Sequence, residues 1–122
     1  MRFAAIFCIL CVGAFAETWR GALVDADCYS SVTHNINPHD TEMYVNRDKE
    51  WDIRRCAPRA KTSSFTMVPL NGMEPFRLDP SGNARAAELV RKAGGAKFVT
   101  VDVIGTPMPK KTVRVDSISL AK

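Results

Sequence analysis

The strongest constraint on the fold is the alternating stretch Phe98–Thr106, FVTVDVIGT. Three valines, at every second position from Val99, fall on one side of an extended chain, whereas Thr100 and Asp102 fall on the other. This period of two predicts a β-strand with one buried face. We expect the rest of the chain to be built around this strand.

Four other segments favour strands because they are short, apolar and bounded by turn residues. They are Trp19–Asp25, Ser64–Leu70, Glu74–Leu78 and Thr112–Leu120. Asn71-Gly72 is a strong turn signal and predicts a hairpin between the second and third strands. Gly21 suggests a bulge or bend in the first strand, and Pro69 suggests the end or an edge of the second.

The last of these strands changes its alternation partway along. Val113 and Val115 share one face, while Ile118 and Leu120 have the other parity. A β-bulge at Asp116-Ser117 would return both pairs to the core.

One segment, Ala84–Ala93, is a clear amphipathic helix, with a single apolar stripe at helical spacing. Asn83 is a suitable N-cap for it. Arg91 lies in the last turn, where the helix dipole favours cations, and Gly94-Gly95 ends the helix.

The segment Ala26–Ser63 has no clean period and is rich in turn residues, so it predicts a long loop. Two short helices fit within it, Thr41–Val45 capped by Asp40, and Asp48–Cys56. A loop of this length in a compact domain needs a constraint that holds its ends together.

The order strand, long loop, strand, strand, helix, strand, strand is that of the OB-fold, a five-stranded, partly open Greek-key barrel. The helix would close one end of the barrel. The ligand-binding loops would then be Ala26–Ser63 and Gly105–Lys111. The alternative is another α+β sheet with a helix on one face.

The N-terminal residues 1–16 predict a cleaved signal peptide. Arg2 precedes the apolar run Phe3–Val12, which is too short to cross a bilayer, and Ala14-Phe15-Ala16 forms a cleavage site. Cleavage between Ala16 and Glu17 leaves residues 17–122 as one domain that is secreted or periplasmic, without stable membrane insertion. Its net charge of +3 is scattered and does not favour a nucleic-acid partner.

Two of the four cysteines, Cys8 and Cys11, leave with the signal peptide. We expect Cys28 and Cys56 to form a disulfide, because exported proteins fold under oxidising conditions. A metal or redox pair is the alternative, although the spacing is not that of a C-x-x-C motif.

The segment Trp19–Cys28, WRGALVDADC, resembles the opening of an uncharacterised family of small exported bacterial proteins. The ends of those proteins are similar to Val99–Thr106 and Val113–Ile118. The resemblance implies an OB-like fold and carries no established activity. Many members have C-A-x-x-C before the second strand, where this chain has Cys56–Ala60, CAPRA, so a role that needs a third cysteine is not implied.

A small group of side chains has the chemistry of metal ligands. The candidates, besides the cysteines, are Asp25, Asp27, His34 and His39. Imidazole suits zinc or copper, and the two acids could contribute to a calcium site. The spacing matches no standard site, so metal binding is the alternative function and we expect no cofactor.

The leading functional hypothesis is a non-enzymatic binding module whose partner is an unknown ligand or protein of the cell envelope. The candidate binding surface comprises Tyr44, Trp51, Met108 and Lys110. A minor hydrolase is a third hypothesis. It ranks below the other two because the chain shows no nucleophile motif such as G-x-S-x-G. A nucleic-acid partner is not expected, since the strands carry few aromatic residues for base stacking.

Overall fold

A computed structural model describes residues 16–33, 42–96 and 98–121, without the side chains of 33 and 42–48. Apart from Ala16, the predicted signal peptide lies outside these residues. His34, His39 and the side chain of Tyr44 also lie outside them.

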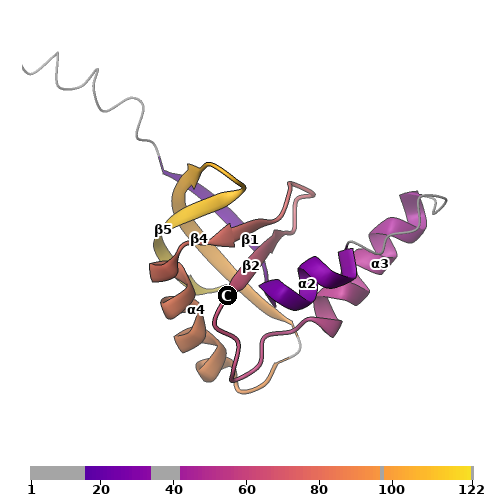
Figure 1. Ribbon diagram of the computed structural model, residues 1–122, viewed down its shortest axis with the longest axis horizontal. Helices are drawn as coiled ribbons and strands as arrows, with labels where there is room; N and C mark the ends of the chain where they lie inside the picture. Colours follow the sequence, from indigo (N-terminus) through magenta and orange to yellow (C-terminus); the bar gives the residue numbers. More distant parts are fainter. Residues whose placement is uncertain (1–15, 34–41, 97, 122) are drawn as a thin grey trace, which may run out of the picture.

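Five strands form a closed barrel in the order β1-β2-β3-β5-β4, in which β4 pairs back with β1 (Figure 1). The strands are β1 (Glu17–Asp25), β2 (Phe65–Pro69), β3 (Phe76–Leu78), β4 (Val99–Met108) and β5 (Thr112–Leu120). All neighbours are antiparallel except β3 and β5, which are parallel. The barrel is OB-like, as the order of elements predicts.

The barrel interior is filled by the side chains of alternate strand residues, which point inward. Leu23 lies opposite Met67, which in turn lies opposite Phe76, and all three are buried in one cluster. The alternating valines of β4 join this cluster, which confirms the buried face predicted for that strand. Trp19 packs against Phe76 with a ring-centroid distance of 4.9 Å.

The predicted bulge in β5 is confirmed by the register with β4. Ile104 pairs with Ser117 and Gly105 pairs with Val115, so Asp116 is left without a partner across β4. The extra residue changes the parity of the strand, and both Ile118 and Leu120 pack against the interior cluster.

The helix α4 (Pro80–Ala93) begins four residues earlier than its apolar stripe suggests. Asn83 is not its N-cap. Asp79 caps it by accepting a hydrogen bond from Gly82 N at 3.0 Å, and Pro80 occupies the first turn, where its missing N–H costs nothing. The Asn83 side chain instead accepts from Phe65 N at 3.0 Å, which ties α4 to β2.

The end and the buried face of α4 agree with the prediction. Gly94 has φ 63°, the left-handed C-cap conformation that glycine adopts without strain. Ala86 and Val90 are buried in the same cluster as the barrel interior. The helix therefore covers one end of the barrel core.

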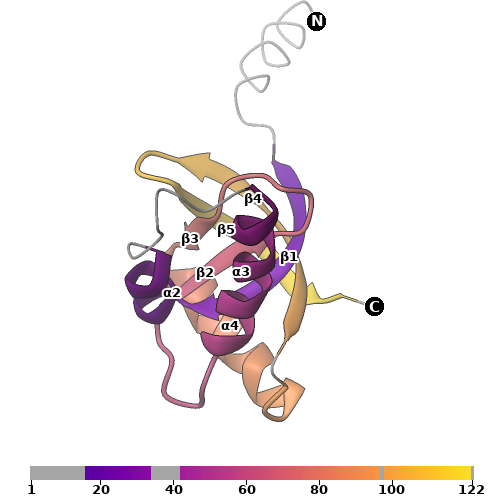
Figure 2. The ribbon, with the colours of Figure 1, turned by 90° about the vertical axis from the view of Figure 1, so that its right-hand side faces the viewer.

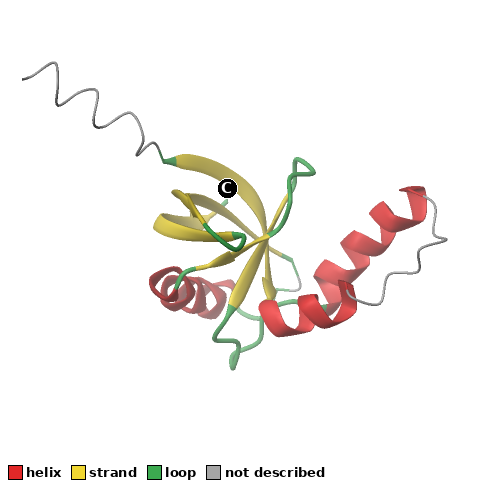
Figure 3. Ribbon diagram, turned by 45° about the horizontal axis from the view of Figure 1, so that its top comes forward, coloured by secondary structure: helices red, strands yellow, loops and turns green. Residues whose placement is uncertain are grey.

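The segment predicted as a long loop is largely helical, which corrects the prediction. It contains α2 (Ala26–Thr33) and a single helix α3 (Glu42–Arg55), in place of the two short helices expected at Thr41–Val45 and Asp48–Cys56. Figures 2 and 3 show both helices on the outside of the barrel, on a different side from α4. We call α2 and α3 the helical cover.

The helical cover exists because β1 and β2 are apolar on both faces. Their outward residues Ala22, Val24 and Val68 are fully buried in a second cluster, separate from the barrel interior. Tyr29 and Ile53 supply the facing side chains. Burying this outer face removes apolar surface from water, which is what holds the two helices against the barrel.

Gly21 is not at a bulge, because β1 keeps an unbroken register with β2 and β4 there. It marks a close approach between strands. A Cβ at this position would lie 2.6 Å from Met67 Sδ and 2.8 Å from Pro69 Cα. Only glycine fits at this position without a backbone shift.

Candidate functional site

The predicted disulfide links the first helix of the helical cover, α2, to the residue that follows its second helix, α3. Cys28 in α2 and Cys56 just after α3 are bonded at an S–S distance of 2.05 Å, with Cα atoms 5.5 Å apart. The backbone N–H of Asp25 donates to Cys56 O at 2.8 Å, so the end of α3 is also hydrogen-bonded to the end of β1. This confirms the pairing and fixes where the cover sits.

The predicted metal-ligand candidate Asp25 has a structural role. One carboxylate oxygen accepts from Cys28 N at 3.1 Å and so caps α2, and the other accepts from Thr62 Oγ1 at 2.8 Å. Asp27 is exposed in the first turn of α2. Among the described residues, no three histidine, cysteine, aspartate or glutamate side chains are grouped as a metal site requires. Metal binding through His34 and His39 stays a prediction.

A groove of about 620 Å³ crosses the outer surface of the barrel at the edge of the helical cover. Three elements form it: α2, the β2–β3 hairpin with its strands, and the turn between β4 and β5. The groove is lined by Ala26, Tyr29, Ser30, Thr66, Glu74, Pro75, Phe76, Arg77, Lys110 and Lys111. This volume falls in the range of sites that hold small molecules or short segments of a chain.

The register of the barrel explains where the groove lies. Val24, Thr66, Arg77 and Thr112 are successive partners across β1, β2, β3 and β5, so their side chains share the outer face. Val24 lies fully under the helical cover, Thr66 lies at its edge, and Arg77 is exposed. The groove therefore forms where the cover ends and the outer face of the sheet becomes accessible.

The turn between β4 and β5 is shorter than predicted. The sequence indicates a loop from Gly105 to Lys111, but β4 continues to Met108 and leaves only Pro109–Lys111 outside the strands. Lys110 has φ 64° and Lys111 has φ 55°, so the backbone of both lysines is in the left-handed conformation. Arg77 N donates to Lys111 O at 2.9 Å, which holds this turn against β3.

The groove carries an excess of positive charge. Arg77, Lys110 and Lys111 line it, and Glu74 is the only acid among the lining residues that the structure describes. Lys111 Nζ lies 3.6 Å from Glu74 Oε2, and both side chains are more than 70% exposed, at 72% and 77%. Such an exposed pair contributes little stability and exchanges readily for another partner. Arg77 Nη2 donates to Ser64 Oγ at 3.4 Å, beyond the groove lining.

Tyr29 forms the wall that the helical cover presents to the groove. It is 7% exposed and belongs to the outer apolar cluster. Burial, and to a lesser extent the negative charge of Asp52, raises the pKa of its phenol. The phenol therefore stays protonated at neutral pH and can act as a hydrogen-bond donor.

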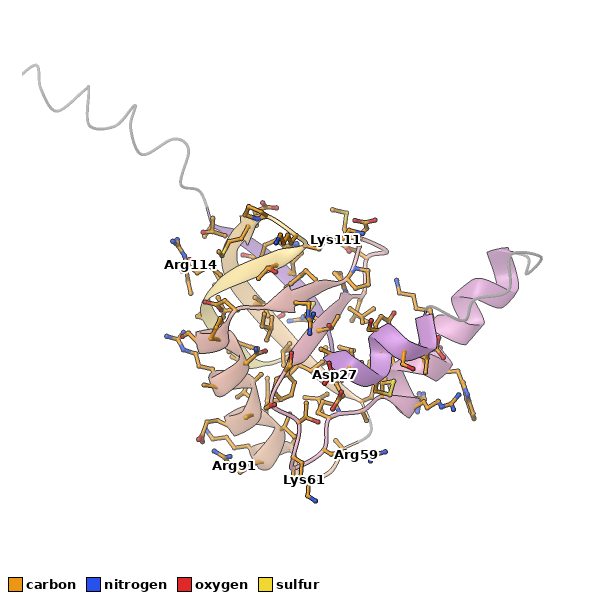
Figure 4. The ribbon with its side chains drawn as sticks, viewed as in Figure 1. Asp27, Arg59, Lys61, Arg91, Lys111 and Arg114 are labelled. Atoms are coloured by element: carbon orange, nitrogen blue, oxygen red, sulfur yellow. A yellow bond between two sulfur atoms is a disulfide. The ribbon has the colours of Figure 1, made fainter. Side chains whose placement is uncertain are left out.

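The structure separates the residues of the predicted binding surface. Lys110 lines the groove, whereas Met108 (45% exposed) ends β4 outside the lining and Trp51 (66% exposed) projects from α3. The candidate surface does not name Arg77 or Lys111, although Lys111 is the last residue of the predicted ligand-binding loop Gly105–Lys111. The alternation of the third strand does place Arg77 outward, but nothing in the sequence shows that Lys111 joins it. Figure 4 shows Lys111 at the opposite end of the molecule from Lys61 and Arg91.

A smaller pocket of about 160 Å³ lies beside the disulfide. Besides the two cysteines and Asp25, it is lined by Arg55, Ala57 and Arg59. It is too small for more than a few water molecules or a small ion, so the larger groove is the candidate site.

Within the described part of the chain, no helix is both long enough and apolar enough to cross a bilayer. Comparisons of the chain with protein-family models, with curated proteins and with solved structures find no match.

Proposed function

We propose that this protein is an exported, non-enzymatic binding module, and that the groove over β2 and β3 holds a negatively charged ligand. The observation that carries the proposal is the position of three cations at this groove. OB-folds bind their ligands on the face of strands 2 and 3, between the loops that follow strands 1 and 4. Here those loops supply α2 and Lys110-Lys111, and β3 supplies Arg77.

The chemistry of the lining supports binding rather than catalysis. A nucleophilic enzyme needs a serine, threonine or cysteine next to a base. The lining side chains within the described part of the chain include hydroxyls and cations, and no histidine or cysteine is among these. These groups can bind and orient an anion, and the one carboxylate among the described lining residues, Glu74, faces Lys111.

The disulfide supports the exported location, because cystines persist in oxidising compartments and are rare in the cytosol. Processing of the predicted signal peptide is tested by N-terminal sequencing of the protein recovered from outside the cytoplasm. The proposal expects the chain to start at Glu17. A chain that still begins at Met1 would contradict it.

Charge reversal at the groove tests the binding function. The protein is titrated at low ionic strength with polyglutamate, polygalacturonate and oligo-dT, and Lys111→Glu is compared with Lys61→Glu. Both variants change the net charge equally, but Lys61 is exposed and lies outside the groove. We expect at least one polyanion to bind, with an affinity that falls about 5-fold or more in Lys111→Glu and within about 2-fold in Lys61→Glu.

Two results would overturn this function. One is that none of the polyanions binds. The other is that both variants weaken binding equally, because the attraction would then follow the net charge of the molecule instead of the groove.

A further inference from the structure

We propose that the ligand of the groove is an acidic peptide segment in extended conformation, held by Lys110, Lys111 and Arg77. This inference rests on the proposed function and names the class of ligand. It is carried by three observations: the mixed apolar and cationic lining, the left-handed conformation of the two lysines, and the exposed pair between Lys111 and Glu74.

The lining suits a peptide better than a glycan or a nucleic acid. Of the apolar residues in the lining, Pro75 is partly exposed next to the cations, whereas Ala26 and Phe76 are buried. A chain that alternates apolar and acidic side chains can contact both Pro75 and the cations. Among the described residues that line the groove, none is an asparagine or glutamine that would bind sugar hydroxyls. Tyr29 and Phe76 are each only 7% exposed, so neither offers a free ring face on which a base could stack.

The turn that carries the two lysines is strained. In the three-residue loop Pro109–Lys111, positions with positive φ are normally occupied by glycine or asparagine, because a Cβ is disfavoured there. Lys110 and Lys111 occupy these positions at φ 64° and 55°. Strain of this kind persists where the side chains serve a function, and here it places two cations at the rim of the groove.

Glu74 acts as an internal competitor for the peptide carboxylates. Its Oε2 lies 3.6 Å from Lys111 Nζ, at the position an incoming carboxylate would take, and both side chains are highly exposed. A ligand therefore replaces Glu74 at Lys111 without burying a charge. Removing the Glu74 charge should strengthen binding, which a merely structural role of this residue would not produce.

The first experiment measures binding of a fluorescently labelled peptide in which glutamate alternates with leucine. Its control is the same peptide with glutamine in place of glutamate. We expect the acidic peptide to bind and the glutamine peptide not to bind. The affinity for the acidic peptide should fall about 10-fold in Lys111→Glu and rise about 2-fold to 5-fold in Glu74→Gln, and it should be unchanged in Lys61→Glu. Equal binding of both peptides, or weaker binding in Glu74→Gln, would overturn the inference.

The second experiment replaces the turn by Lys110→Asn with Lys111→Gly. Relief of the left-handed strain should raise the melting temperature by about 5 °C. Loss of the two cations should lower the affinity for the acidic peptide about 10-fold or more. Because the variant is expected to be more stable than the parent chain, lost binding cannot come from unfolding. Unchanged peptide affinity, or a lower melting temperature, would contradict the inference.

The failure of this inference can be distinguished from that of the proposed function. If polygalacturonate or oligo-dT binds in a Lys111-dependent manner and the acidic peptide does not, the groove still binds anions and only the peptide assignment is wrong. If no anion binds in a Lys111-dependent manner, both proposals fall.

Discussion

At the scale of single residues, Asp25 connects the barrel to the helical cover. Its carboxylate caps α2 through Cys28 N and accepts from Thr62 Oγ1, while its N–H donates to Cys56 O. In the sequence, Asp25 lies three residues before Cys28, which is compatible with a metal ligand. The structure instead places its carboxylate in hydrogen bonds that position one wall of the groove.

We expect Asp25→Ala to lower the free energy of unfolding by about 2 kcal/mol, because the helix cap and a second hydrogen bond are lost. Asp27→Ala is the control, since Asp27 is exposed in the first turn of the same helix and its loss should cost less than about 1 kcal/mol. Urea unfolding of both variants measures the difference. Equal effects would assign the contribution of Asp25 to its charge near the helix start alone.

A second residue-scale prediction concerns pH. Arg20 donates to Asp102 from Nε at 2.7 Å and from Nη2 at 3.1 Å across β1 and β4. The hydrogen bond from Arg20, with a smaller Coulombic attraction and against a desolvation effect, lowers the pKa of Asp102. Because the folded-state pKa is lower than the unfolded one, the pair stabilises the fold above about pH 4 and this contribution is lost as the pH falls through the folded value.

Asp102→Asn should therefore lower stability at neutral pH, and its difference from the parent chain should shrink below about pH 4. Both chains are unfolded with urea over an acidic pH series. The difference should also shrink at high salt, because the pair is exposed. A difference that is independent of pH would show that the charge of Asp102 contributes nothing.

At the scale of elements, the strands and the bulge could be predicted and the helical cover could not. The period-2 valines of β4 and the parity change in β5 are patterns among neighbouring residues, so they can be recognised in the sequence alone. The helix α2 is only eight residues long and carries mostly small and polar side chains, so it shows no apolar stripe. Its partner surface, the outer face of β1 and β2, appears only after the barrel has closed.

The same distinction applies to the groove. Lys110 could be proposed because it lies in a loop that OB-folds use for binding, and Arg77 could be placed outward by alternation. That Arg77 and Lys111 meet depends on the parallel pairing of β3 with β5, which joins residues 35 positions apart in the register Arg77–Thr112. No local pattern encodes that pairing. Trp51 is a candidate surface residue and is exposed, but α3 carries it outside the groove lining.

The disulfide is predicted to stabilise the helical cover, because it links α2 to the residue that follows α3. Replacing both cysteines by serine should cost about 3–4 kcal/mol in the chain-entropy model. Hydrogen exchange should show faster exchange in α2 and α3 than in β4 and β5, since the barrel interior has its own core. Uniformly faster exchange across the barrel would mean that cover and barrel unfold as one unit.

At the scale of the whole molecule, two apolar clusters share one pair of strands. The barrel interior is closed by α4, and the outer cluster is closed by α2 and α3. The cover extends over β1 and β2 and stops before β3, which leaves a basic strip of β3 and the β4–β5 turn beside the edge of α2. The position of the groove thus follows from how far the second cluster extends.

We propose that anions bind in this groove. The most direct test is a titration of the isotope-labelled protein with the alternating glutamate–leucine peptide, followed by backbone amide chemical shifts. We expect the largest shifts at Thr66, Arg77, Lys110 and Lys111, and at the start of α2. Shifts confined to α3 around Trp51, or to the pocket around Arg55 and Arg59, would contradict it.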